Sequence, residues 1–159
     1  QMAASETLEA LRESILTLED DREFDLRSCW NEIWEEQRGR LDQKGFKHEN
    51  AVVGEFTRIV DSRVYVNIKR IAEELVTNIL KYGDPADVVR CESEIARDGS
   101  FRVRLTNSVL FTPEGNSTGG RGRPNIEARA NEIGAAVSFS KATGSPAAYI
   151  AVLEVPLET

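Results

Sequence analysis

Three polar side chains with complementary chemistry occur at helical spacing near the middle of the chain. Glu74, Asn78 and Lys81 occupy positions i, i+4 and i+7, which places a carboxylate, an amide and an ammonium group on one stripe of a helix. Such a stripe suits a metal-bound triphosphate: an amide oxygen can coordinate Mg²⁺, a carboxylate can orient or deprotonate a nucleophile, and a lysine can neutralise phosphate charge. Exposed helices often carry Glu–Lys stripes too, so the pattern alone also fits a solvated polar face.

A glycine-rich run at 119–123 is a second candidate site for phosphate. It precedes Pro124, which suits the first turn of a helix, so its backbone N–H groups would lie at the positive end of that helix. We expect Gly120, Arg121 and Gly122 to contact the phosphates. Without other evidence, a glycine loop is equally typical of a surface connection.

Asn107 is the third candidate. The alternation of Phe101, Val103 and Leu105 continues to this residue, which predicts that its side chain points to the buried face at the end of a strand. A buried amide needs hydrogen-bond partners. The sequence leaves two interpretations open: Asn107 closes a turn, or it bonds a ligand.

The elements that would position these residues follow from the spacing of apolar side chains. From residue 24 onward the pattern predicts a helix, a strand, a long helix, a hairpin of two strands, a loop, a helix and two strands. In the same order, the expected helices are 24–45, 62–82 and 124–133, and the expected strands are 46–53, 89–95, 101–105, 136–141 and 148–155. The expected loop is 112–123. This order predicts an α+β fold, an α/β sandwich with a mixed sheet on one side and helices on the other.

Residues 5–20 predict a further amphipathic helix ahead of this unit. Leu8, Leu11, Ile15 and Leu18 follow a three-four-three spacing with charged residues between them, as in a coiled-coil seam. Two heptads are too few to establish a coiled coil. The helix either pairs with a partner helix or packs on its own domain.

Composition excludes some classes of partner and indicates a compartment. The formal net charge is −7, from 20 Lys and Arg against 27 Asp and Glu, which argues against general binding to nucleic-acid phosphates or an anionic membrane surface. Cys29 and Cys91 match no metal spacing and are expected to be reduced, packed thiols, which indicates the cytoplasm. No apolar run approaches the ~20 residues of a membrane span. Whether the chain is the cytoplasmic part of a membrane-bound receptor stays open.

The order of these pieces resembles a known family. RIAEELVTNILKYG at 70–83 resembles the N box of the GHKL ATPases, especially in the nitrate-sensor and desaturase-sensor group of histidine kinases. GGRGRPNIEARANEIGAAVSF at 119–139 resembles that group's second glycine box and the helix after it. The resemblance implies that 24–159 is a histidine kinase-like ATPase domain with the Bergerat-type sandwich. It also implies that 1–20 is the remnant of the helical dimerisation and phosphoacceptor domain.

The resemblance implies a protein-histidine kinase that uses ATP and Mg²⁺. Asn78 would hold Mg²⁺ against the phosphates, and Glu74 would orient or deprotonate the attacking imidazole. The glycine loop would close over the triphosphate, with Lys81 and Arg121 neutralising charge. The implied partners are a second copy of the chain, through the N-terminal helix, and a response regulator that receives the phosphoryl group.

Four departures from the family pattern affect these expectations. Asn107 stands where the family has the aspartate that accepts a hydrogen bond from adenine, and Val109 replaces a glycine. Tyr149 replaces a threonine on the last strand, and Tyr82 replaces a histidine after the N box. An Asn107→Asp substitution would restore a charged acceptor, so we expect it to tighten adenine-nucleotide binding roughly tenfold unless the pocket is filled.

The phosphoacceptor histidine of the family has no counterpart in these residues. His48 is the one histidine of the sequence and is expected to be a surface residue of a strand. We therefore expect the acceptor helix to precede residue 1 in a longer protein. The alternatives are a degenerate, non-catalytic pseudokinase that dimerises through the N-terminal helix, and an anti-sigma-factor-like serine kinase on the same fold.

Overall fold

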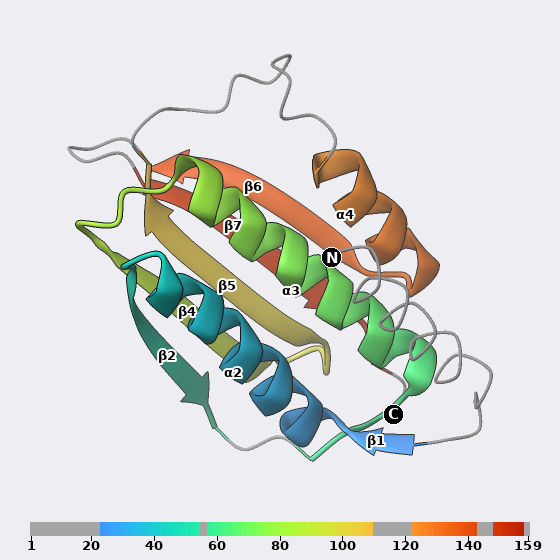
Figure 1. The fold of residues 1–159 in the computed structure, drawn as a ribbon. Helices are drawn as coiled ribbons and strands as arrows, with labels where there is room; N and C mark the ends of the chain where they lie inside the picture. The colour runs from blue at the N-terminus through green and yellow to red at the C-terminus, as the bar shows by residue number, and fades with distance from the viewer. Residues whose placement is uncertain (1–22, 55–56, 110–121, 143–147, 158–159) are drawn as a thin grey trace, which may run out of the picture.

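The computed structural model describes residues 23–54, 57–109, 122–142 and 148–157, which form a mixed sheet with helices on one face (Figure 1). The elements in chain order are β1 (Glu23–Asp25), α2 (Leu26–Gln43), β2 (Lys47–Val53), β3 (Ile59–Asp61), α3 (Ser62–Tyr82), β4 (Val88–Ile95), β5 (Phe101–Ser108), α4 (Gly122–Glu132), β6 (Ala136–Ala142) and β7 (Ala148–Val155). The predicted α+β class is confirmed. The helix expected at 5–20 lies outside the described residues, as does most of the loop expected at 112–123.

The main sheet has five strands in the order β2-β4-β5-β7-β6. β2 pairs with β4 in parallel, and the other neighbours pair antiparallel, which confirms the predicted hairpin between β4 and β5. Residues of period two separate the faces: Val89, Cys91 and Ser93 are buried, whereas Arg90 and Glu92 are exposed. The helices α2, α3 and α4 cover the apolar face (Figure 1).

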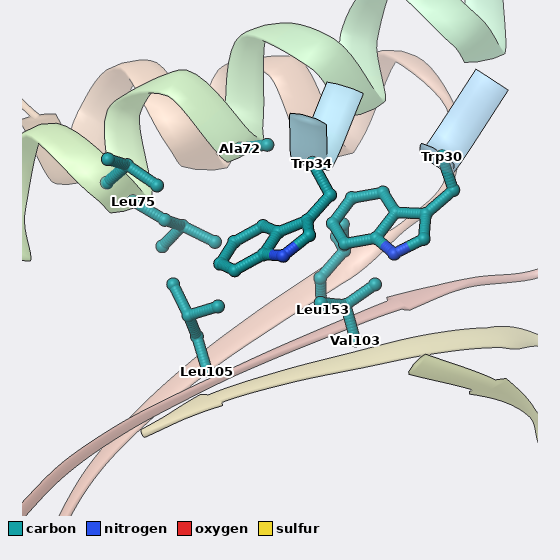
Figure 2. A pocket seen from close by; sticks show the side chains of 8 residues that line it. Trp30, Trp34, Ala72, Leu75, Val103, Leu105 and Leu153 are labelled. Carbon is teal, nitrogen blue, oxygen red and sulfur yellow. The ribbon is translucent and has the colours of Figure 1, made fainter. Parts of the chain in front are cut away.

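The core between helices and sheet contains both tryptophans, as predicted. Trp30 and Trp34 are 2% and 4% exposed, and their indoles lie between α3 and the strands (Figure 2). They line an apolar cavity of about 10 Å³, which is no larger than a water molecule requires. This cavity is therefore not a site for a metabolite or nucleotide.

The two cysteines are buried and free, in agreement with the expected packed thiols. Burial raises the pKa of Cys29 to about 12, with the nearby Glu32 carboxylate as a smaller cause. The pKa of Cys91 is also raised, mainly by burial. Both thiols are therefore protonated at neutral pH and poor nucleophiles.

The long helix α3 has the bounds that its sequence predicts. Its apolar stripe is buried against the sheet, and Asp61 caps its first turn by accepting a hydrogen bond from the Val64 amide at 2.9 Å. Gly83 ends the helix, and its N–H donates to the Ile79 carbonyl at 2.7 Å. A Cβ atom at Gly83 would lie 2.5 Å from that carbonyl oxygen, so only glycine fits here.

A small ribbon of β1 and β3, which the sequence did not predict, ties the starts of two helices together. Asp25 follows Phe24 at the end of β1 and caps α2, while Asp61 ends β3 and caps α3. The Leu26 amide donates to the Arg58 carbonyl at 2.8 Å. The ribbon therefore sets the relative position of the N-terminal ends of α2 and α3. None of the helices in the described ranges is long and apolar enough to span a membrane.

Replacing Asp61 with alanine is expected to lower the free energy of unfolding by about 1 kcal/mol, because the first turn of α3 loses its capping acceptor. Urea unfolding of both proteins measures the difference. Asp61→Asn is the matched control, since asparagine caps equally well and should retain the stability of the parent chain. Equal stability of the alanine variant would show that the cap contributes nothing.

Candidate functional site

Glu74 and Asn78 lie on the flank of α3 that faces α4. On the opposite flank α2 packs against α3, where Arg40 bonds the Glu73 carbonyl and the Thr77 hydroxyl. Each residue advances a helix by about 100°, so the residues that follow Glu73 and Thr77 turn away from α2. Helix α4 packs on α3 at that side and runs antiparallel to it (Figure 1).

Both candidate side chains are half-buried, and the structure shows no hydrogen bond from either Glu74 or Asn78 to another described residue. A carboxylate and an amide held beside the sheet without internal partners can act on a ligand. Lys81 continues the stripe and is exposed in the last turn of the helix. The three side chains therefore follow one stripe of α3, as predicted. Glu74 and Asn78 are partly screened from solvent, and Lys81 is exposed.

Asn107 belongs to β5 and lies beside the C-terminal end of α3. It is 6% exposed, which confirms that it points to the buried face, and a Cβ atom at Gly83 would lie 3.2 Å from its Nδ2 atom. Its Nδ2 donates to the Ser108 carbonyl at 3.1 Å, and that carbonyl also accepts from the Asp84 amide at 2.9 Å. The amide group is thus anchored through its nitrogen. Its oxygen has no partner among the described residues and remains an acceptor.

A support for Asn107 comes from the turn after α3, which the sequence analysis did not single out. The Ser108 hydroxyl donates to a carboxylate oxygen of Asp87 at 2.6 Å, and the Val88 amide donates to the other oxygen at 2.9 Å. The Ser108 hydrogen bond is the main reason why the pKa of Asp87 lies below its usual value. The signal for this support was the pair of aspartates around Pro85, since aspartates of turns bond nearby backbone amides.

An aromatic pair, Tyr149 and Phe139, includes the cross-strand neighbour of Asn107. Tyr149 of β7 is directly opposite Asn107 in the ladder, and alternates with the buried Ala151 and Leu153. Its ring centroid is 6.0 Å from that of Phe139 in β6, with the planes tilted by 32°. Asn107 and Tyr149, two of the four departures from the pattern that the sequence resembles, are therefore cross-strand neighbours.

Gly122 is the one candidate residue of the glycine loop that falls within the described residues. Gly120 and Arg121 lie outside the described residues, whereas Gly122 is the first residue of α4, two positions earlier than the helix start predicted at Pro124. Because α4 is antiparallel to α3, its N-terminal end points toward the same end of the molecule as the C-terminal half of α3 (Figure 1). That end of a helix favours anions.

Protein side chains alone do not form a metal centre in the described part of the chain. No group of three or more His, Cys, Asp or Glu side chains there could hold an ion. Mg²⁺ seldom uses such a cage, because it is commonly bound by one or two protein oxygens together with substrate phosphates. The amide of Asn78 fits that mode of binding.

His48 differs from its expected position. It lies in β2 as predicted, but its side chain is only 15% exposed and its Nε2 atom is 2.8 Å from a carboxylate oxygen of Asp42. The ring packs edge-on against Trp34. The expectation of a surface histidine is therefore wrong, because β2 turns this residue toward the helices. It lies on α2's side of α3, away from Glu74.

Solved structures identify the fold. The catalytic domain of histidine kinase ThkA matches with a TM-score of 0.68 at 18% identity, over 86% of this chain and 96% of that one. A blue-light activated histidine kinase of Erythrobacter litoralis matches with 0.69 at 19%, over 98% and 54%, and full-length ShkA in complex with AMPPNP with 0.67 at 17%, over 100% and 39%. No family model and no curated protein matches the chain.

The chain therefore has the fold of histidine kinase catalytic domains. It spans most of the ThkA domain and about half or less of the two longer kinases. The comparisons give no support for the narrower placement in the nitrate-sensor and desaturase-sensor group.

Proposed function

We propose that residues 24–159 are the ATP-binding catalytic domain of a sensor histidine kinase, which supports histidine autophosphorylation and transfer to a response-regulator aspartate. The observation that carries this proposal is the position of Glu74 and Asn78. They lie half-buried on the flank of α3 that faces α4 and make no hydrogen bonds to other described residues. Asn107 of β5 lies beside the C-terminal end of the same helix. The likeness to ShkA, whose structure contains AMPPNP, supports a nucleotide as the ligand.

In this proposal the chain binds and orients the nucleotide, and Mg²⁺ supplies charge neutralisation at the phosphates. Asn78 would hold the ion through its amide oxygen. Glu74 would orient or deprotonate the imidazole, whose nitrogen attacks the γ-phosphorus as the bond to ADP breaks and ADP leaves. Lys81 and the loop residues Gly120, Arg121 and Gly122 contact the phosphates. Positioning of the reactants is the main contribution of a protein to phosphoryl transfer, which suits a site with few charged residues.

Calorimetric titration of the chain with AMPPNP, with and without Mg²⁺, tests the proposal. We expect binding that Mg²⁺ strengthens at least several-fold, because the amide oxygen and the phosphates would share the ion. A chain that does not bind AMPPNP at millimolar concentration would contradict the proposal.

That negative result would favour a second candidate, a non-catalytic pseudokinase that retains the fold. Tyr149 is the observation that supports it. Tyr149 is the cross-strand partner of Asn107 and its ring contacts that of Phe139. An aromatic ring therefore stands next to Asn107, at the position where the resembling kinases have a threonine. An aromatic ring can either fill this space or stack on a base.

The proposed partners are a second copy of the chain and a response regulator, and the proposed location is the cytoplasm. Deleting residues 1–20 is expected to convert a dimer into a monomer while the melting temperature and AMPPNP affinity stay the same, since each unit would bury its own core. Sedimentation and thermal unfolding measure both effects. If the deletion unfolds the domain, residues 1–20 belong to its core and the proposed boundary is wrong.

A further inference from the structure

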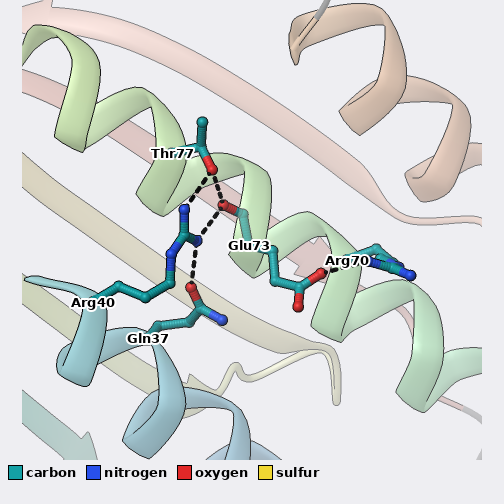
Figure 3. Close-up of polar contacts among 5 residues, drawn as sticks. All are labelled: Gln37, Arg40, Arg70, Glu73 and Thr77. Atoms are coloured by element: carbon teal, nitrogen blue, oxygen red, sulfur yellow. Dashed lines mark hydrogen bonds and ion pairs between the residues drawn. The ribbon is translucent and has the colours of Figure 1, made fainter. Parts of the chain in front are cut away.

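An arginine clasp joins α2 to α3 on the flank opposite the candidate site. We use this name for Arg40, Gln37, the Glu73 carbonyl and the Thr77 hydroxyl (Figure 3). The Arg40 Nη1 atom donates to Gln37 Oε1 at 2.9 Å and to the Glu73 carbonyl at 3.1 Å, and Nη2 donates to Thr77 Oγ1 at 2.8 Å. These three acceptors are neutral, so the clasp consists of directional hydrogen bonds and contains no ion pair.

The two acceptors of Arg40 on α3 are also hydrogen-bonded to each other. The Thr77 hydroxyl, which accepts from Arg40, donates to the Glu73 carbonyl at 2.8 Å. One turn of α3 is therefore held by a guanidinium fork at two points, and the fork is planar and rigid. Gln37 fixes the other side of the guanidinium and is 1% exposed, so the anchor on α2 is itself immobilised by packing.

The two atoms that Arg40 holds belong to the residues immediately before Glu74 and Asn78. The Glu73 carbonyl is part of the peptide group whose nitrogen belongs to Glu74, and Thr77 is bonded directly to Asn78. A rotation of α3 about its axis would move all four residues together. Apolar contacts against Trp34 and the sheet permit small rotations, whereas two directional hydrogen bonds to one guanidinium oppose them.

We propose that Arg40 is a positioning residue, which fixes the rotation of α3 and so the direction in which Glu74 and Asn78 face the nucleotide. The inference rests on the proposed function. Arg40 itself bonds the backbone and hydroxyl on the far flank of the helix, and so acts through α3 without contacting the ligand.

The experiment is titration of the full chain with AMPPNP, in the presence and absence of Mg²⁺. Arg40→Met retains a long unbranched side chain but removes all donors. We expect it to weaken binding about tenfold with Mg²⁺ and to change binding without Mg²⁺ little, because a metal ligand is sensitive to its orientation. Arg38→Met is the matched control: Arg38 lies on the same helix, pairs with Glu35 of that helix, and should behave as the parent chain.

Thr77→Val provides a second variant that changes the core less. It retains the branched shape and removes the hydroxyl, and a several-fold loss confined to the Mg²⁺ titration is expected. This variant decides the question if Arg40→Met does not fold. An equal loss with and without Mg²⁺, or a folded variant that keeps the full Mg²⁺ effect, would overturn the inference. A parent chain whose binding Mg²⁺ does not strengthen would contradict the proposed function instead, and the inference with it.

Discussion

Replacing Asn78 with alanine is expected to weaken AMPPNP binding in the presence of Mg²⁺ by about 100-fold, and to leave binding without Mg²⁺ nearly unchanged. The loss of an outer-shell partner typically costs 10–100-fold in metal affinity, so the loss of a direct ligand should lie at or above the upper end of that range. The fold should be retained, because the Asn78 side chain is half-buried and has no hydrogen bond to the described residues.

Two further substitutions separate the metal effect from other causes. Asn78→Asp keeps the shape and changes the charge at the ion, so it should alter the Mg²⁺ dependence while thermal unfolding stays the same. Asn50→Ala, at an exposed asparagine of the edge strand β2, should change neither the Mg²⁺ dependence of AMPPNP binding nor thermal unfolding. Parent-like binding of Asn78→Ala with Mg²⁺ would remove this residue from the site.

Local sequence signals were sufficient to predict α3 and the placement of its polar stripe. The apolar residues of 62–82 repeat at helical spacing over several turns, and Gly83 with Pro85 supplies a stop, so the predicted and observed bounds agree. Because helix geometry is local, the same prediction placed Glu74 and Asn78 on one flank. The hairpin was predictable for a similar reason, although β5 extends three residues further, to Ser108.

The sequence could not predict features that depend on contacts between distant segments. β1 and β3 have three residues each, which is too short to show a period. They pair with one another although α2 and β2 lie between them in the sequence. His48 packs against Trp34 of a different element, so its own strand pattern could not show that it faces inward. The clasp likewise joins Arg40 to Glu73 and Thr77, which lie 33 and 37 positions further along the chain.

The orientation of the Asn107 amide is the most consequential of these non-local features. It depends on the Ser108 carbonyl, which also accepts from the Asp84 amide beyond the end of α3. With its nitrogen held there, the amide presents its oxygen as an acceptor. An exocyclic amine, as in adenine, would match that oxygen, and the carbonyl at the corresponding position of guanine would not.

Asn107→Asp is therefore expected to destabilise the chain at neutral pH, by about 2 kcal/mol, and to weaken nucleotide binding. A carboxylate has no proton to donate, so one of its oxygens would face the Ser108 carbonyl, where Nδ2 now lies at 3.1 Å. The position is 6% exposed, and a buried polar group left without its partner costs ~1–3 kcal/mol. The effect expected from this geometry is opposite in direction to the tenfold tightening expected from the sequence alone.

The destabilisation should depend on pH with a definite sign. Burial and the facing carbonyl favour the neutral acid, so the pKa of the introduced carboxyl group is raised in the folded state. A raised folded-state pKa gives stability that is present at low pH and lost as the pH rises through it. The deficit of the variant should thus shrink toward pH about 4, the usual range of an aspartate, where the acid can donate to the Ser108 carbonyl.

Thermal unfolding of parent and variant from pH 4 to pH 8, together with titration of ATP and GTP into both, measures these effects. Asn50→Asp is the matched control, because it makes the same chemical change at an exposed position and should cost no more than about 0.5 kcal/mol. If Asn107→Asp is as stable as the parent chain at pH 8 and binds ATP more tightly, the Ser108 carbonyl does not anchor the amide. In that case Asn107 would be a weakened substitute for a charged acceptor, as the sequence alone suggested.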